Sequence, residues 1–176
     1  MKVTLLMLLL TFSISSYAVD VLSEALKAYE KGDYTLAQKG FKVAAKKGDA
    51  QAEYNLGYMS EQGQGVKQNY KTALAWYEKS AVQGYVDAQY NAATFYYKGL
   101  GVEQNYEKAM YWYAEAAKNG DRKAHYNLGV MYVKGEGVER NKIKAYQYWI
   151  EAAKRSSTRA EDSLDLLCKE SPWACK

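Results

Sequence analysis

The chain has 176 residues, of which 48% are hydrophobic and 25% charged, and a formal net charge of +4. This length suits one domain with a continuous core. Lysines and arginines are interspersed with acidic residues and form no basic stripe, which argues against a nucleic-acid-binding protein. Pro172 is the only proline, and Ala, Tyr, Lys, Glu and Gln dominate, so we expect helices throughout.

The first 18 residues have the layout of a secretory signal peptide. Lys2 precedes an apolar run over residues 3–14. Ser16 and Ala18 then place small residues at the two positions that a signal peptidase reads. An uncleaved membrane anchor is the alternative, but the run is shorter than the roughly 20 residues that a membrane span needs. We predict cleavage after Ala18, a periplasmic or secreted protein that begins near Val19, and no stable membrane insertion.

An internal repeat with an offset of 36 residues occupies most of the remaining chain. An Ala-x-Tyr-Asn motif, a Gly-x-Gly-Val motif and a following Asn recur without insertion or deletion. The motifs begin at Ala52, Ala88 and Ala124, and at Gly63, Gly99 and Gly135, and the asparagines are Asn69, Asn105 and Asn141. Such a period is typical of stacked supersecondary units.

Each unit has the pattern of a helix, a glycine loop and a second helix. Ala52, Leu56 and Met59 follow the i, i+4, i+7 spacing of one apolar helix face. Gly63 suits the left-handed position past the end of this first helix, the A helix. Asn69 is a good N-cap for the second helix, the B helix, because its side chain can accept from free backbone N–H groups.

The two ends of the repeat region differ from its centre. Residues 19–48 keep the repeat pattern, with an A helix expected over residues 22–30 and a shorter loop that lacks Gly-x-Gly-Val. Beyond residue 156 the pattern stops, and residues 160–169 predict one more helix. Terminal repeats often depart from the pattern because they cap the stack.

Cys168 and Cys175 are the only cysteines, and we predict that they form a disulfide. In a continuous helix their separation of seven residues would place them about 10 Å apart, too far for a bond. Pro172 breaks the helix between them, and cysteines of exported proteins usually pair. A redox pair is the less favoured alternative, since active pairs usually have the Cys-x-x-Cys spacing.

The sequence contains no recognisable catalytic or cofactor site. His125 is the only histidine and shares its repeat position with Glu53 and Gln89, so we expect it at the surface. One histidine and two cysteines do not complete a metal ligand set. The Gly-x-Gly motifs lack the strand and the other glycines of a nucleotide site. Carboxylates are scattered over positions expected to be exposed, and we predict a protein that is not an enzyme and has no cofactor.

Residues 49–156 resemble three tandem Sel-one-like repeats, over 49–84, 85–120 and 121–156. The matching signature is Ala-x-Tyr-Asn-Leu-Gly, Gly-x-Gly-Val, Asn-Tyr-x-x-Ala and Trp-Tyr-x-x-Ala-Ala. The departures are Ala93 for Gly, Ser80 for Ala, Lys142 for Tyr, and the order Tyr148-Trp149. Residues 19–48 resemble a tetratricopeptide unit, and residues 157–176 would be a capping helix with a disulfide loop. The resemblance implies an all-α, right-handed superhelical solenoid of helix-turn-helix repeats.

The resemblance also implies that the A helices line a concave groove that binds a protein or peptide. The partner-binding candidates are Tyr54, Asn55, Tyr58, Glu61, Tyr90, Asn91, Thr94, Tyr97, Tyr126, Asn127 and Val130. Tyr offers a large rigid surface with a polar end, and Asn can bond both backbone groups of a peptide. Alternatively, the recurring Tyr and Asn serve packing between repeats. The positions that vary between repeats are then the better candidates for partner choice.

Several functions are consistent with these features. The members of the family are mostly adaptors and assembly scaffolds, which implies an exported bacterial adaptor. A periplasmic immunity protein that neutralises a toxic effector, and an envelope or host-interaction factor, are alternatives. Some cysteine-rich relatives are described as binding or cleaving β-lactams, but those carry a disulfide in each repeat, and this chain has two cysteines in all.

Overall fold

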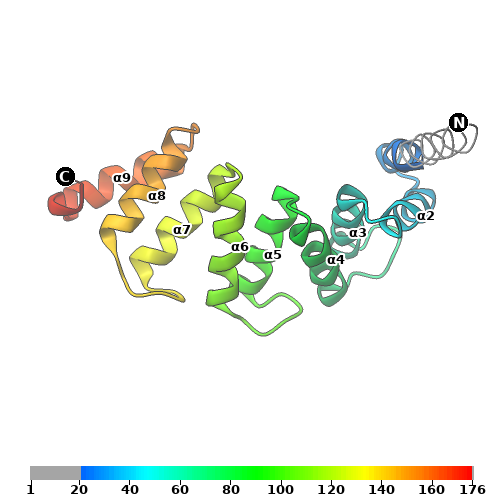
Figure 1. The fold of residues 1–176 in the computed structure, drawn as a ribbon, viewed down its shortest axis with the longest axis horizontal. Helices are drawn as coiled ribbons and strands as arrows, with labels where there is room; N and C mark the ends of the chain where they lie inside the picture. The colour runs from blue at the N-terminus through cyan, green and yellow to red at the C-terminus, as the bar shows by residue number, and fades with distance from the viewer. Residues whose placement is uncertain (1–20, 176) are drawn as a thin grey trace, which may run out of the picture. The chain divides into compact units, whose positions relative to one another are not determined.

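The computed structural model describes residues 21–175, and all regular secondary structure in this range is helical (Figure 1). The signal peptide and cleavage site predicted for residues 1–18 lie outside the described residues. Residues 21–30 form the first described helix. It is followed by α2 (Tyr34–Ala45), α3 (Ala50–Gln62), α4 (Tyr70–Val82), α5 (Val86–Lys98), α6 (Tyr106–Lys118), α7 (Arg122–Lys134), α8 (Lys142–Ala153), α9 (Thr158–Glu170) and the short 3₁₀ helix η1 (Pro172–Cys175). The predicted all-α repeat fold is confirmed.

The chain divides after Ser80 into two compact units, unit 1 up to that residue and unit 2 from Ala81 onward. Unit 1 has a core in which alanines surround a few large side chains. Its buried apolar residues are Ala25, Ala28, Ala37, Phe41, Ala44, Ala45, Ala52, Leu56 and Met59. The alanines let the helix backbones approach closely, and Phe41 and Met59 fill the space beside them.

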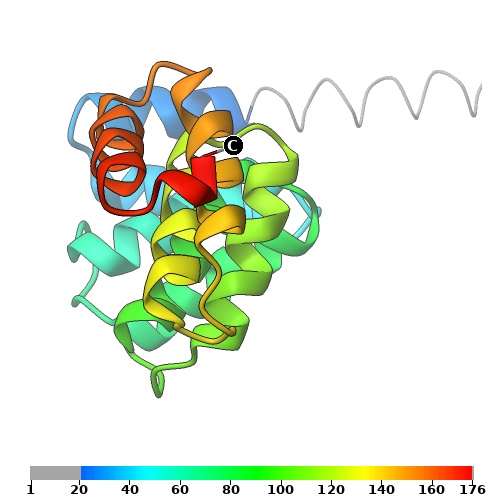
Figure 2. The ribbon, with the colours of Figure 1, turned by 90° about the vertical axis from the view of Figure 1, so that its left-hand side faces the viewer.

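In unit 2 consecutive helices pack against one another from α5 to α9 (Figures 1 and 2). The same alternation of small and large side chains fills its core. Its fully enclosed alanines include Ala88, Ala92, Ala109, Ala116, Ala124, Ala145 and Ala152, and its large buried residues include Phe95, Tyr113, Leu128, Met131 and Trp149. The repeat of the sequence is therefore a repeat of core packing.

Both helix-end signals of the repeat behave as the sequence predicts. The A helices of the three central repeats, α3, α5 and α7, each end at a left-handed glycine, with φ of 71° at Gly63, 69° at Gly99 and 76° at Gly135. The asparagines Asn69, Asn105 and Asn141 accept a hydrogen bond from a backbone N–H three residues later. These caps satisfy backbone groups that a helix end leaves without a partner.

A second kind of glycine lies inside the A helices, where helices A and B touch. A Cβ atom added to Gly57 would lie 2.7 Å from the Tyr77 ring, and one added to Gly129 would lie 2.3 Å from Nε1 of Trp149. Real side chains do not approach so closely. The absence of a side chain at these positions is therefore a condition for the aromatic ring of the B helix to fit.

The helix α9 takes the place of an A helix in a further repeat. Ala160 and Leu167 follow Ala124 and Met131 at the repeat offset of 36 residues. All four side chains are buried, and α9 packs on α8. The predicted capping helix thus covers the last repeat by the same contacts that join one repeat to the next.

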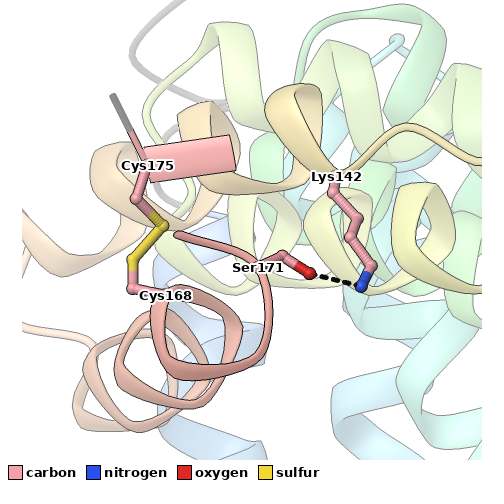
Figure 3. The surroundings of a disulfide bond; sticks show 4 residues. All are labelled: Lys142, Cys168, Ser171 and Cys175. Carbon is pink, nitrogen blue, oxygen red and sulfur yellow. Dashed lines mark hydrogen bonds between the residues drawn. A yellow bond between two sulfur atoms is a disulfide. The ribbon is translucent and has the colours of Figure 1, made fainter. Parts of the chain in front are cut away.

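The C-terminal cap is held by the predicted disulfide and by a hydrogen bond to α8 (Figure 3). Cys168 in α9 bonds Cys175 in η1, with 5.7 Å between the Cα atoms. Nζ of Lys142, in the first turn of α8, donates to Oγ of Ser171 at 2.6 Å, and Ser171 is buried. The chain reverses between α9 and η1, at the proline that the sequence analysis singled out.

Candidate protein-binding face

One prediction about site residues is wrong: the repeat position of Glu53, Gln89 and His125 is buried, with 7%, 3% and 8% of each residue exposed. Nε2 of Gln89 donates to the carbonyl of Ala81 at 3.2 Å. Nδ1 of His125 lies 2.9 Å from the carbonyl oxygen of Asp121. The side chains of Gln89 and His125 are thus buried against backbone carbonyls at helix ends, and neither His125 nor Glu53 is the surface group that the sequence analysis expected.

The recurring tyrosine of each A helix packs against an aromatic ring of the B helix in its own repeat. The ring centroids lie 5.7 Å apart for Tyr54 and Tyr77, 5.6 Å for Tyr90 and Tyr113, and 6.3 Å for Tyr126 and Trp149. The B-helix ring is buried in every pair, whereas the A-helix tyrosine is half-buried. The tyrosine therefore covers the core with one face of its ring and leaves the other face at the surface.

Two of the variable candidates are tied to the hydroxyl of that B-helix tyrosine. The Tyr77 hydroxyl donates to the Glu61 carboxylate at 2.5 Å. The Tyr113 hydroxyl lies 3.1 Å from Oγ1 of Thr94, and burial raises the pKa of Tyr113 far above its usual value. Glu61 and Thr94 thus satisfy buried hydroxyls, which gives their identities a structural reason.

In the third repeat Trp149 replaces the tyrosine, and the variable positions change with it. Trp149 has no hydroxyl, and its Nε1 donates to the carbonyl of Tyr126 at 3.0 Å. Val130 and Val133, which occupy the places of Thr94 and Tyr97, pack against the cluster that contains Trp149. An apolar residue fits here because there is no hydroxyl to satisfy.

In unit 1 the four candidates lie on α3, and they differ in exposure. Tyr54 and Glu61 contact Tyr77, as described above, and Nδ2 of Asn55 donates to the carbonyl of Gln51 at 2.8 Å. Tyr58 is the most exposed of the four, at 36%. The large apolar surface that α3 presents to solvent is therefore that of Tyr58.

In unit 2 most of the candidates line two adjoining pockets. The first has a volume of about 180 Å³ and is lined by Tyr90, Thr94, Tyr97, Lys98, Tyr113, Asn127 and Val130. The second, of about 430 Å³, is lined by Tyr90, Arg122, Lys123, Tyr126, Asn127, Ser156, Ser157, Thr158 and Arg159. Tyr90 and Asn127 belong to both, and Asn127 Nδ2 donates to the Tyr90 hydroxyl at 3.5 Å. We call this pair of pockets the A-helix groove; Asn91 is half-buried and lines neither pocket.

Tyr97 lines the first pocket and also fixes the loop of the next repeat. Its hydroxyl donates to Oε2 of Glu136 at 2.8 Å and accepts from Nζ of Lys134 at 3.2 Å. Burial, and then the bond to Glu136, raises the pKa of Tyr97, and the bond to Tyr97 raises the pKa of Lys134. This network holds the ring in one orientation, so the wall of the groove is preorganised.

The basic residues of the second pocket were missed by the sequence analysis. Arg122 and Lys123 begin α7, and Arg159 lies one repeat offset after Lys123. In the preceding repeats these positions hold other residues, Ala50 and Gln51 in one and Val86 and Asp87 in the next. Charges that are interspersed along the chain still converge in space when they recur at the repeat offset, and this offset was the signal available.

Within residues 21–175, no group of three or more His, Cys, Asp or Glu side chains could hold a metal ion. In the same range, no helix is both long and apolar enough to cross a membrane.

Comparison with known proteins identifies the repeat. Three Sel1 repeats match the chain, at residues 50–85, 86–121 and 122–157. The chain belongs to the Sel1 repeat family. None of the curated proteins matches it.

Solved structures share the Sel1 repeat fold. A Sel1 repeat protein from Oxalobacter formigenes is 29% identical with a TM-score of 0.82, over 88% of this chain and 63% of its own. The protein c5321, a protective antigen of uropathogenic Escherichia coli strains that displays an SLR fold, is 30% identical with a TM-score of 0.84, over 94% of this chain and 36% of its own. Cysteine-rich protein B of Helicobacter pylori, 22% identical with a TM-score of 0.56, covers 72% of this chain and 96% of its own and supports the fold alone. The chain thus spans less than two thirds of the first two relatives.

Proposed function

We propose that this Sel1 repeat protein is an exported scaffold that binds a segment of a partner protein in the A-helix groove of unit 2. The observation that carries the proposal is the continuity of the groove. Two pockets share Tyr90 and Asn127, and together they have room for several side chains of a bound chain. Tyrosine rings and an amide line them, which suits recognition of a peptide.

The rigidity of the groove supports a binding role. Tyr90 is packed on Tyr113, and Tyr97 is held by Glu136 and Lys134. Binding to preorganised side chains costs less conformational entropy than binding to mobile ones. The half-exposed tyrosine faces can therefore serve a partner although the same rings are needed for packing.

Export is supported by two features. The first 18 residues have the layout of a signal peptide, and the cap contains a disulfide between Cys168 and Cys175. Structural disulfides form and persist in oxidising compartments such as the periplasm or the extracellular medium.

Val130→Arg tests the binding role directly. Val130 is half-buried and lines the smaller pocket, so an arginine side chain would fill it while its charged end reaches water. Val82→Arg is the matched control, because Val82 is 76% exposed on α4, is not among the residues that line the groove, and undergoes the same change.

The proteins captured from an envelope extract by the wild type and by both variants are then compared. We expect a partner that the wild type and Val82→Arg retain and that Val130→Arg loses at least about thirty-fold, as for a hot-spot contact. Equal recovery by all three, with unchanged helicity, would place the binding site outside the groove.

A further inference from the structure

We propose that the larger pocket of the A-helix groove binds the carboxylate side chains of an acidic peptide segment of the partner. This inference rests on the proposed function and adds the chemical class of the bound segment. Three basic side chains line the pocket: Arg122 and Lys123 from the start of α7, and Arg159 from the start of α9. The other lining residues are Tyr, Asn, Ser and Thr, and none is acidic.

The basic groups are not neutralised by neighbouring carboxylates. In the described part of the chain, no ion pair involves Arg122, Lys123 or Arg159. The nearest acid along α7, Asp121, is engaged as N-cap, because its Oδ1 accepts from the backbone N–H of Ala124 at 2.6 Å. Glu161, in the first turn of α9, is not among the lining residues. No carboxylate therefore lines the pocket or forms an ion pair with its three basic side chains within the described residues.

Arg122 is held in place by the loop between α8 and α9. Its Nη1 donates to the carbonyls of Ser156 and Arg155 at 3.1 and 3.4 Å. A guanidinium has five N–H donors, so donors remain for a ligand after these bonds. A fixed arginine is well suited to a carboxylate, which it can bind through two parallel hydrogen bonds.

The other lining groups are also hydrogen-bond donors. Lys123 Nζ lies 5.6 Å from the centroid of the Tyr90 ring, at the junction with the smaller pocket. Ser157 stands at the N-cap of α9 and makes no side-chain cap bond, so its hydroxyl is not committed to the helix end. Hydroxyls and backbone N–H groups at a helix start favour an anion, and here they add to three cationic side chains.

The neighbouring pocket defines what should stand beside the acidic residue. Val130, Thr94 and the rings of Tyr90 and Tyr97 form its walls, and it is the smaller of the two. A side chain of moderate size with apolar surface fits there. The bound segment should therefore combine Asp or Glu with an adjacent aliphatic or aromatic residue. Acidic side chains give complementarity to the basic pocket and speed the encounter with it.

Three sets of labelled ten-residue peptides test the proposal with the full mature chain. In each set apolar residues alternate with one polar type, which is Glu in the first set, Gln in the second and Lys in the third. Affinity is measured by fluorescence anisotropy at low and high salt. We expect the Glu peptides to bind at least about tenfold more tightly than the Gln peptides, and this advantage to shrink at high salt.

The double variant Lys123→Glu/Arg159→Glu should abolish the preference for Glu peptides. Both substitutions lie in first helical turns, where a negative side chain is favourable, so the variant should fold. The control Lys118→Glu/Lys169→Glu makes the same change of charge at exposed positions of α6 and α9 that do not line the groove, and it should behave as the wild type.

The outcomes separate this inference from the proposed function. Equal affinity for Glu and Gln peptides, or an unchanged preference in the Lys123→Glu/Arg159→Glu variant, would overturn the acidic specificity and leave a peptide-binding groove. If none of the three peptide sets binds, both claims are contradicted: the specificity for acidic segments and the binding of peptides in the groove.

Discussion

At the scale of single residues, contacts between the A and B helices of a repeat determine which side chains fit at the contacting positions. Gly57 and Gly129 have no side chain because an aromatic ring of the B helix occupies that space. Glu61 and Thr94 are polar because each contacts a tyrosine hydroxyl. Val130 packs against the cluster that contains Trp149, which has no hydroxyl. Amino-acid differences between equivalent positions of the repeats therefore depend on the packing partner of each side chain as well as on any ligand.

The close contact at Gly129 predicts that Gly129→Leu destabilises the protein. The new side chain would overlap the Trp149 ring, and overpacking of this kind costs about 1–3 kcal/mol or more. Thermal unfolding followed by circular dichroism measures the loss. Ala114→Leu, on the exposed side of α6, is the control and should change stability by less than about 0.5 kcal/mol. Equal melting temperatures for the two variants would show that the glycine is not in a tight contact.

The buried hydroxyl of Tyr113 predicts a loss of stability in alkali. Burial raises the pKa of Tyr113 in the folded protein, whereas the unfolded chain ionises this group near its usual value of 10.0. The contribution of the neutral hydroxyl is thus complete below about pH 10 and falls as the pH rises toward the folded pKa. In Tyr113→Phe the free energy of unfolding should fall less steeply with pH than in the wild type, by up to about 1.4 kcal/mol per pH unit.

Urea unfolding at several pH values from about 9 to 11.5 measures that slope. Tyr111→Phe is the control, since Tyr111 lies on the same helix and is 58% exposed. It should keep the slope of the wild type. An equally steep loss of stability with pH in Tyr113→Phe and in the wild type would disprove this role of the Tyr113 hydroxyl.

At the scale of helices, the 36-residue offset predicted the order, the ends and the pairing of the A and B helices. It could do so because each repeat needs the same caps and the same small residues at its contacts. Two features did not follow from the sequence alone. The burial of Gln89 and His125 depends on contacts of their side chains with backbone carbonyls at helix ends. The basic pocket depends on α9 lying beside α7 as an A helix would.

The C-terminal cap gives a prediction at this scale. Reduction of the Cys168–Cys175 disulfide should lower the free energy of unfolding by about 2–3 kcal/mol, because the bond restricts a short loop in the unfolded chain. The fold should persist, since the core lies in the repeats. Urea unfolding with and without reductant provides the measurement, and in the Cys168→Ser/Cys175→Ser variant the reductant should have no effect. Alkylation of both cysteines in unreduced protein would contradict the assignment.

At the scale of the whole molecule, we propose that the chain of Sel1 repeats, with its capped C-terminal end and the A-helix groove in unit 2, is exported. Export predicts that the protein recovered from the periplasm or the medium lacks its first 18 residues. Intact-mass measurement checks this, with protein from cells treated with a signal-peptidase inhibitor as the control. An exported species that retains Met1 would disprove cleavage after Ala18.

The central claim is that a partner binds in the A-helix groove, and site-specific photocrosslinking in living cells tests it most directly. A photoreactive residue at position 127 lies where the two pockets join, and one at the exposed position 111 of α6 is the control. We expect a discrete crosslinked species from position 127, none from position 111, and loss of the species when Lys123→Glu and Arg159→Glu are added. A species of equal yield from both positions, or from position 111 alone, would contradict the claim.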